Sequence, residues 1–96
     1  MTTYDVLLGA QPREYIAALD DKSRRIVKDN LGKLAADPYP GSGKGDKEHL
    51  VVDGEEMYRL HIGRRHTAFY LINEDDVEVR VVEIVDIDEA HKRYGF

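Results

Sequence analysis

Four side chains that can bind or transfer a proton to a phosphate lie close together in the second half of the chain. Arg59 and His61 alternate on one predicted strand, and Arg64 and Arg65 follow in the turn after it. Alternate residues of a strand point to the same face of a sheet. A guanidinium binds phosphate, and an imidazole exchanges a proton near neutral pH. The pattern predicts a phosphate site, although a solvated sheet face with cross-strand ion pairs is the commoner origin of such residues.

The predicted strand pairing gives these residues neighbours. A four-residue loop over residues 63–66 places Ile62 opposite Thr67, and a five-residue loop after Leu71 places Leu71 opposite Val77. We expect the helices to cover the apolar face that results. The other face then carries two rows: Arg59, Tyr70 and Glu78 in one, and His61, Ala68 and Arg80 in the other. In this register the small Ala68 leaves a depression between His61 and Arg80.

Two helices are expected near the start of the chain. Pro12 suits the first turn of a helix that carries Tyr15, Ile16 and Leu19 on one face. Apolar residues at helical spacing predict a second helix over residues 22–36, capped by Asp20 and Asp21 and ended by Asp37-Pro38. A short closing helix is expected over residues 87–94.

The strands are expected mainly after the helices. Residues 4–8 form a first short strand, and the glycine-rich stretch 39–48 is a loop. Period-two patterns then predict four strands in series, joined by connections short enough to force antiparallel neighbours, at residues 50–52, 57–62, 67–72 and 77–85. The prediction is one α+β domain over residues 1–96, with a strand and two helices packed on an antiparallel meander.

Composition excludes several kinds of site. The chain has no cysteine, and its four histidines include no pair at the spacing of helical metal ligands, so we expect no metal and no cofactor. The segment 41–46 lacks the residues of a phosphate-binding glycine loop. The longest apolar runs cannot span a bilayer, and a cytoplasmic location is expected. The net charge of −5 disfavours general nucleic-acid binding, but residues 1–73 carry equal numbers of acids and bases.

One segment resembles the core signature of the RelE/ParE toxin superfamily. It covers residues 57–63, Met-Tyr-Arg-Leu-His-Ile-Gly, and is followed by a strand that ends in Phe69-Tyr70. The order of elements is also similar over nearly the whole chain. The phrases at residues 19–26 and 89–95 resemble archaeal RelE-like toxins. The resemblance implies a RelE-like fold and the toxin of a type II toxin–antitoxin pair, with an antitoxin protein, the ribosome and mRNA as partners.

The resemblance also implies a site and an activity. RelE-like members cut mRNA in the ribosome without a metal, using basic side chains on the sheet and a C-terminal tyrosine. These positions correspond here to Arg59, His61 and Tyr94, with Arg64, Arg65, Arg80, His91 and Tyr70 in supporting or RNA-binding roles. This chain has Thr67 where the family usually carries arginine, and acids at Asp86 and Asp88 where it often has a base. A gyrase-inhibiting ParE-like toxin and a catalytically inactive, antitoxin-binding homologue stay open as alternatives.

Overall fold

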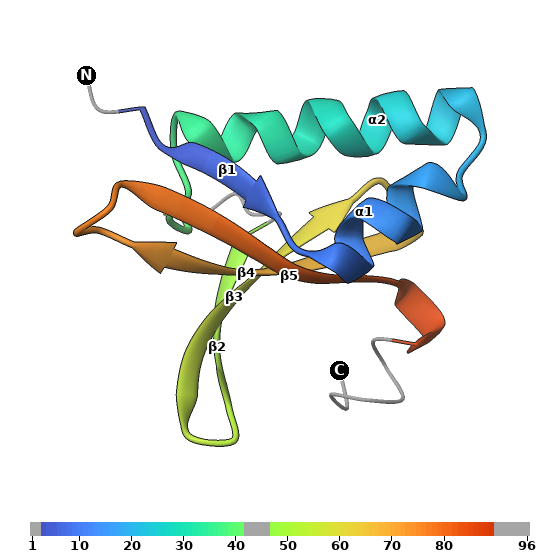
Figure 1. The fold of residues 1–96 in the computed structure, drawn as a ribbon. Coiled ribbons are helices and arrows are strands. Elements are labelled where there is room, and N and C mark those ends of the chain that lie inside the picture. The colour runs from blue at the N-terminus through green and yellow to red at the C-terminus, as the bar shows by residue number, and fades with distance from the viewer. Residues whose placement is uncertain (1–2, 42–46, 90–96) are drawn as a thin grey trace.

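A five-stranded sheet with two helices on one of its faces makes up the fold (Figure 1). The structure, a computed structural model, describes residues 3–41 and 47–89. In chain order its elements are β1 (Asp5–Leu8), α1 (Ala10–Ala17), α2 (Asp21–Gly32), the short 3₁₀ helix η1 (Lys33–Ala35), β2 (Lys47–Val52), β3 (Glu55–Ile62), β4 (His66–Asn73) and β5 (Glu78–Asp86).

The sheet has the order β1-β5-β4-β3-β2. Strands β2 to β5 form the expected antiparallel meander, whereas β1 pairs in parallel with β5 at the edge. Residues 87–89, directly after β5, are helical, and the rest of the predicted closing helix lies outside the described residues. The predicted α+β class and its arrangement of elements are confirmed.

Helix α2 begins and packs as its sequence predicts. The Asp20 carboxylate accepts a hydrogen bond from the amide of Ser23 (3.2 Å), which satisfies one of the free amides of the first turn. Val27, Leu31 and Leu34 form a buried stripe at helical spacing. The last turn tightens into η1, and Pro38 then prevents the helix from continuing.

The predicted register of the β3–β4 hairpin is wrong by one residue. Ile62 pairs with His66 and Arg59 with Phe69, so the connecting turn has three residues rather than four. The slip turns every β4 side chain to the opposite face. Ala68 and Tyr70 therefore belong to the core under the helices, and Phe69 lies on the other face.

The β4–β5 pairing also differs from the prediction. Asn73 pairs with Glu78 and Ile72 with Val79, and the register then shifts between Phe69 and Tyr70 because of an irregularity in the ladder. A bulge of this kind changes which face later residues occupy. On β5 the inward residues are Val79, Val81 and Ile84, which a strict alternation does not predict.

Both faces of the sheet carry buried apolar side chains. The main core lies between the sheet and the helices, where Ile16, Val27 and Leu31 meet Leu60, Ile62 and Tyr70. A second, smaller cluster of Phe69 and Val85, with Leu50 and Met57 packed against it, lies on the opposite face. This second face is the one that carries Arg59 and His61.

Candidate functional site

Arg59 lies on the sheet face away from the helices, as predicted, but it is buried and paired. Its backbone pairs with Glu48 of β2 on one side and with Phe69 of β4 on the other. The Arg59 guanidinium donates a hydrogen bond from Nη2 to the Glu48 carboxylate, and only 8% of the residue is exposed. Glu48 therefore occupies the position on the guanidinium that a phosphate oxygen would take.

His61 lies on the same face, two residues further along β3. Its Nε2 is 3.7 Å from the other oxygen of the Glu48 carboxylate, and about 30% of its side chain is exposed. This distance is too long for a hydrogen bond, and the two groups form an ion pair only when the imidazole is protonated. One carboxylate therefore lies between the two side chains that the sequence predicts as catalytic.

The tight turn between β3 and β4 presents two further cations. Gly63 takes a left-handed conformation (φ 61°), and Arg64 and Arg65 follow it with exposed side chains. The carbonyl of Arg65 accepts a hydrogen bond from the amide of Ile87 at 2.8 Å. This bond ties the turn to the end of β5, where the C-terminal segment begins.

Two predicted supporting residues lie elsewhere. Tyr70 is fully buried under the helices, where its hydroxyl donates to the carbonyl of Pro38 at 2.6 Å, because the register slip turns it inward. The same slip buries Ala68, so no depression forms beside His61. Arg80 is on the predicted face but pairs with Leu71, while His61 shares its row with Thr67 and Val85. The Arg80 guanidinium forms an ion pair with Glu78 at 3.0 Å and does not approach His61 across the row.

The structure does not describe the predicted C-terminal site residues, but it does place Thr67, which differs from the usual family residue. Tyr94 and His91 lie outside the described residues. Thr67, at the position where the family usually carries arginine, is fully buried between His61 and Val85. Its hydroxyl has no hydrogen-bond partner among the described residues.

A partly buried hydrogen bond between Tyr15 and His66 was not predicted. The Tyr15 hydroxyl and Nδ1 of His66 are hydrogen bonded at 2.7 Å, and the two rings meet edge to face. Burial and the charge of Arg65 lower the pKa of His66, and Asp86 acts against them. Burial, followed by the charge of Asp86, raises the pKa of Tyr15. A three-residue turn over residues 63–65 would have placed His66 at the start of β4, and only that register brings it into the sheet.

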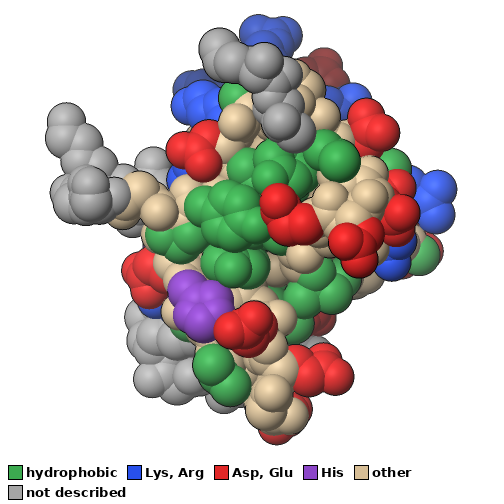
Figure 2. All heavy atoms as spheres, turned by 90° about the vertical axis from the view of Figure 1, so that its left-hand side faces the viewer, with side chains coloured by type: hydrophobic (Ala, Val, Ile, Leu, Met, Phe, Trp, Pro, Cys, Tyr) green, Lys and Arg blue, Asp and Glu red, His purple; other side chains and the backbone are tan. Residues whose placement is uncertain are grey.

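A second unpredicted feature is a tyrosine cluster, made of Tyr4, Tyr39, Tyr58 and Tyr70. The hydroxyls of Tyr4 and Tyr39 both donate to Oε1 of Glu74, and these two bonds lower the pKa of that carboxyl. Figure 2 shows the side of the molecule with the β4–β5 hairpin, where hydrophobic side chains gather with acidic side chains beside them. An acidic border of this kind disfavours RNA on this side.

Within residues 3–41 and 47–89, no three His, Asp or Glu side chains are arranged to hold a metal ion. No helix in these ranges is long and apolar enough to cross a membrane.

Solved structures share this arrangement of a parallel edge strand, two helices and a meander. A chain of the archaeal RelE–RelB complex from Pyrococcus horikoshii is 22% identical with a TM-score of 0.72, over 88% of this chain and 96% of that chain. A chain of the RelBE2 toxin–antitoxin complex from Mycobacterium tuberculosis is 15% identical with a TM-score of 0.73, over 88% of this chain and 99% of that chain. The isolated RelE toxin of E. coli is 16% identical with a TM-score of 0.57, over 94% of this chain and 97% of that chain. The chain has the RelE fold.

The RelE-like fold was predicted from the sequence, and these neighbours confirm it. No protein-family model matches the sequence, and no curated protein matches it. Within this RelE-like sheet, the predicted residues that come together are Arg59 and His61, with Arg64 and Arg65 in the turn that follows their strand. Glu48, which the sequence assigned to a loop, joins them because β2 already begins at Lys47.

Proposed function

We propose that this protein is the toxin of a type II toxin–antitoxin pair and that it cuts mRNA on the ribosome. The observation that carries the proposal is that Arg59 and His61, alternate residues of β3, lie on the same sheet face of a RelE-like fold, away from the helices. The solved complexes of RelE with RelB support an antitoxin partner. The cytoplasm, where ribosomes are found, is the location that this activity requires.

The proposed chemistry is transesterification within the RNA strand. A base takes the proton of the 2′-hydroxyl, the 2′-oxygen attacks phosphorus, and the bond to the 5′-oxygen breaks after an acid protonates that oxygen. His61 is the proposed base, since an imidazole exchanges protons near neutral pH. Arg59, helped by Arg64 and Arg65, stabilises the charge that develops on the phosphorane. Tyr94 is proposed to stack on a base or assist the proton transfer.

Glu48 sets a condition on this mechanism. A phosphate can reach the Arg59 guanidinium only if the carboxylate moves away, because Nε and Nη1 are buried and Glu48 occupies Nη2. The Glu48 side chain is 45% exposed, so rotation into solvent is sterically open to it. We propose that the RNA backbone displaces Glu48 when the substrate enters.

The second candidate is a homologue that binds an antitoxin without cutting RNA. The observation that favours it is the same carboxylate, because Glu48 neutralises the cation that a nuclease would need. Thr67 adds to this, since it is buried and uncharged where the family usually carries an arginine. In that case the fold would be retained for partner binding alone.

A cell-free translation reaction separates the two candidates. The purified protein is added, and the mRNA is mapped by primer extension beside an Arg59→Ala, His61→Ala double variant and an Arg80→Ala control. The proposal expects new cuts at ribosome-occupied codons with the wild type and the control, and none with the double variant. Intact mRNA at high protein concentration contradicts nuclease activity, and supercoiling by purified gyrase is then assayed for inhibition.

A further inference from the structure

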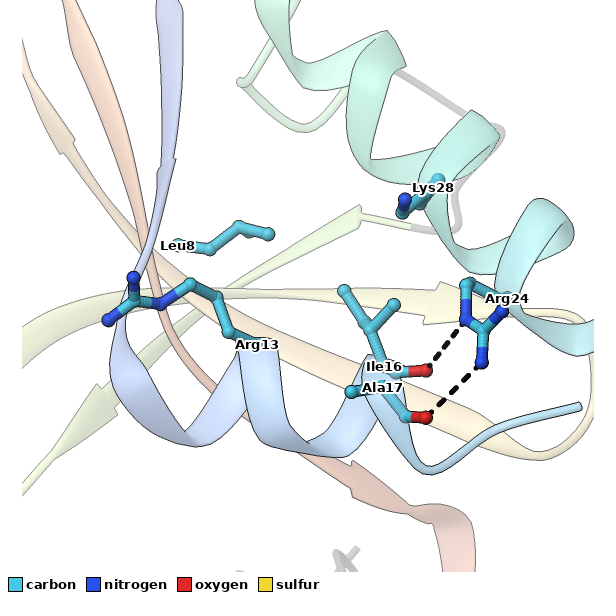
Figure 3. A pocket seen from close by; sticks show the side chains of 6 residues that line it. All are labelled: Leu8, Arg13, Ile16, Ala17, Arg24 and Lys28. Atoms are coloured by element: carbon cyan, nitrogen blue, oxygen red, sulfur yellow. Dashed lines mark hydrogen bonds between the residues drawn. The ribbon is translucent and has the colours of Figure 1, made fainter.

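A groove between α1, α2 and β1 has an apolar floor and a cationic rim (Figure 3). Its volume is about 390 Å³, and the residues that line it are Leu8, Arg13, Ile16, Ala17, Arg24 and Lys28. Figure 3 shows Leu8 and Ile16 between β1, α1 and α2, with Arg13 toward β1 and Lys28 on α2. The site predicted from the sequence uses none of these residues.

Arg24 has a structural task in this groove. Its guanidinium donates to the carbonyls of Ile16 (3.3 Å), Ala17 (3.2 Å) and Leu19 (2.8 Å). The Ile16 and Ala17 carbonyls lie in the last turn of α1 and the Leu19 carbonyl lies just after it, and the Ile16 carbonyl also accepts from the amide of Leu19 (3.1 Å). Its Nη1 also contacts Asp21 at 3.0 Å. Arg24 therefore closes the end of α1 and forms one wall of the groove.

Arg13 and Lys28 are different, because the fold makes no visible use of their charges. Both are exposed, and neither forms a hydrogen bond or an ion pair with any residue in the described ranges. Their charges lie on two sides of aliphatic side chains, among which Ile16 is only 4% exposed. The groove thus combines an apolar floor with two cations that are available to a partner.

The surroundings extend this character. Residues 9–36 hold six Lys or Arg and four Asp or Glu, a net charge of +2 in a chain whose total is −5. Leu8 also lines a neighbouring hollow over β1 and β5 with Leu7 and Val82, which are 43% and 39% exposed. Apolar surface therefore continues from the groove across the edge strand.

We infer that this groove docks an acidic amphipathic segment of a partner protein, with an apolar side chain on the floor and carboxylates against Arg13 and Lys28. The inference rests on the proposed function in one respect, because the antitoxin is the partner that would supply the segment. Charge complementarity selects the sign of the segment. RNA fits less well, because the floor is aliphatic and offers no aromatic ring on which a base can stack.

The test uses the full chain and a designed helical peptide of about 16 residues, with leucines at helical spacing flanked by glutamates. Binding is measured by fluorescence anisotropy and mapped by amide chemical shifts. Three matched probes are compared with it: a scrambled peptide, the same peptide with lysine for glutamate, and a single-stranded oligouridylate. The variants are Arg13→Glu, Lys28→Glu and, as a control on α2 outside the groove, Lys22→Glu.

We expect the acidic peptide to bind and to shift the amides of Leu8, Arg13, Ile16 and Lys28. Each groove reversal should weaken binding by about five- to tenfold, added salt should weaken it further, and Lys22→Glu should leave it unchanged. The peptide with lysine in place of glutamate should bind the Arg13→Glu and Lys28→Glu variants more tightly than it binds the wild type. Shifts located elsewhere, equal binding of the scrambled peptide, tighter binding of the oligouridylate, or no binding at all would overturn the inference.

The groove and the proposed nuclease site fail separately. The Arg13→Glu and Lys28→Glu variants leave the β3 site untouched, so both should cut mRNA as the wild type does in the cell-free reaction. Groove binding without cleavage removes the nuclease and keeps the docking surface. Cleavage without groove binding removes the docking surface and keeps the nuclease.

Discussion

Arg59 and Glu48 form an ion pair between β3 and β2 on the sheet face away from the helices. The arginine is buried and the glutamate is half exposed, so the mobile partner of this pair is the carboxylate. The contact explains how a cation can stay on an apolar face beside Phe69 and Val85. It also makes Glu48 the residue that controls access to the guanidinium.

Replacing Glu48 with glutamine should remove the anion that competes with phosphate for the Arg59 guanidinium. We expect the affinity for a short single-stranded RNA to rise by about three- to tenfold, because an anion no longer competes with the RNA backbone. The free energy of unfolding should fall by about 1–2 kcal/mol, since a charged hydrogen bond between Glu48 and Arg59 becomes a weaker one to a neutral amide. Fluorescence anisotropy and urea denaturation measure the two effects.

Glu55→Gln is the matched control for this change. Glu55 is an exposed acid at the start of β3, and no hydrogen bond or ion pair joins its side chain to the described residues. It loses the same charge without touching Arg59. An equal gain in RNA affinity in both variants would mean that net charge, and not the pairing with Arg59, limits binding.

His66 should make the protein less stable in mild acid. Its pKa is lower in the folded chain than its ordinary value of 6.5, so the unfolded chain takes up the proton more readily. The contribution of neutral His66 is therefore complete above pH 6.5 and is lost as the pH falls from there through the folded pKa. We expect His66→Gln to reduce the fall in unfolding free energy between about pH 6.5 and 5.

The control for the histidine prediction is His49→Gln, which removes an exposed imidazole from β2. Urea denaturation of all three proteins at a series of pH values gives the comparison. The same slope in the wild type and His66→Gln would contradict the assignment of the acid sensitivity to His66.

Tyr70→Phe should destabilise the fold more than a change at an exposed tyrosine. The variant leaves the buried carbonyl of Pro38 without the hydroxyl that it accepts from. The expected loss is about 1–2 kcal/mol in urea denaturation. Tyr39→Phe removes a hydroxyl from an exposed bond to Glu74 and should cost less. A larger loss at Tyr39 would argue against an inward Tyr70.

Gln11 fastens α1 to the sheet through two hydrogen bonds with the backbone of Ile84. Its Nε2 donates to the carbonyl at 2.7 Å, and its Oε1 accepts from the amide at 2.8 Å. Gln11→Ala should lower the free energy of unfolding by about 1–2 kcal/mol. Glu14→Ala, on an exposed position of the same helix, should have a smaller effect in the same denaturation series.

The elements of the fold were predictable because their local signals agree with the packing. Asp20 caps α2, and Val27, Leu31 and Leu34 face the sheet at the spacing that the sequence shows. The residues of β3 that face the helices, Leu60 and Ile62, were also placed correctly, which is why Arg59 and His61 lie on the predicted face.

The register was not predictable from alternation because both faces of β4 are apolar. Phe69 and Tyr70 are both fully buried, one on each face, so burial alone cannot decide which of them points toward the helices. The hydrogen bond from Tyr70 to Pro38 links residues far apart in the sequence and leaves no local signal. Glu48 was missed for a related reason, since the glycine-rich stretch before it hid the start of β2.

The most direct test of the proposed nuclease uses ribosomes programmed with one defined mRNA, and measures single-turnover cleavage. The wild type should cut the mRNA at the codon in the ribosomal A site and leave a 2′,3′-cyclic phosphate. His61→Ala should slow the cut by about 100-fold or more, and Arg80→Ala should not. Undamaged mRNA with the wild type, or equal cutting by His61→Ala, would contradict a nuclease site on β3.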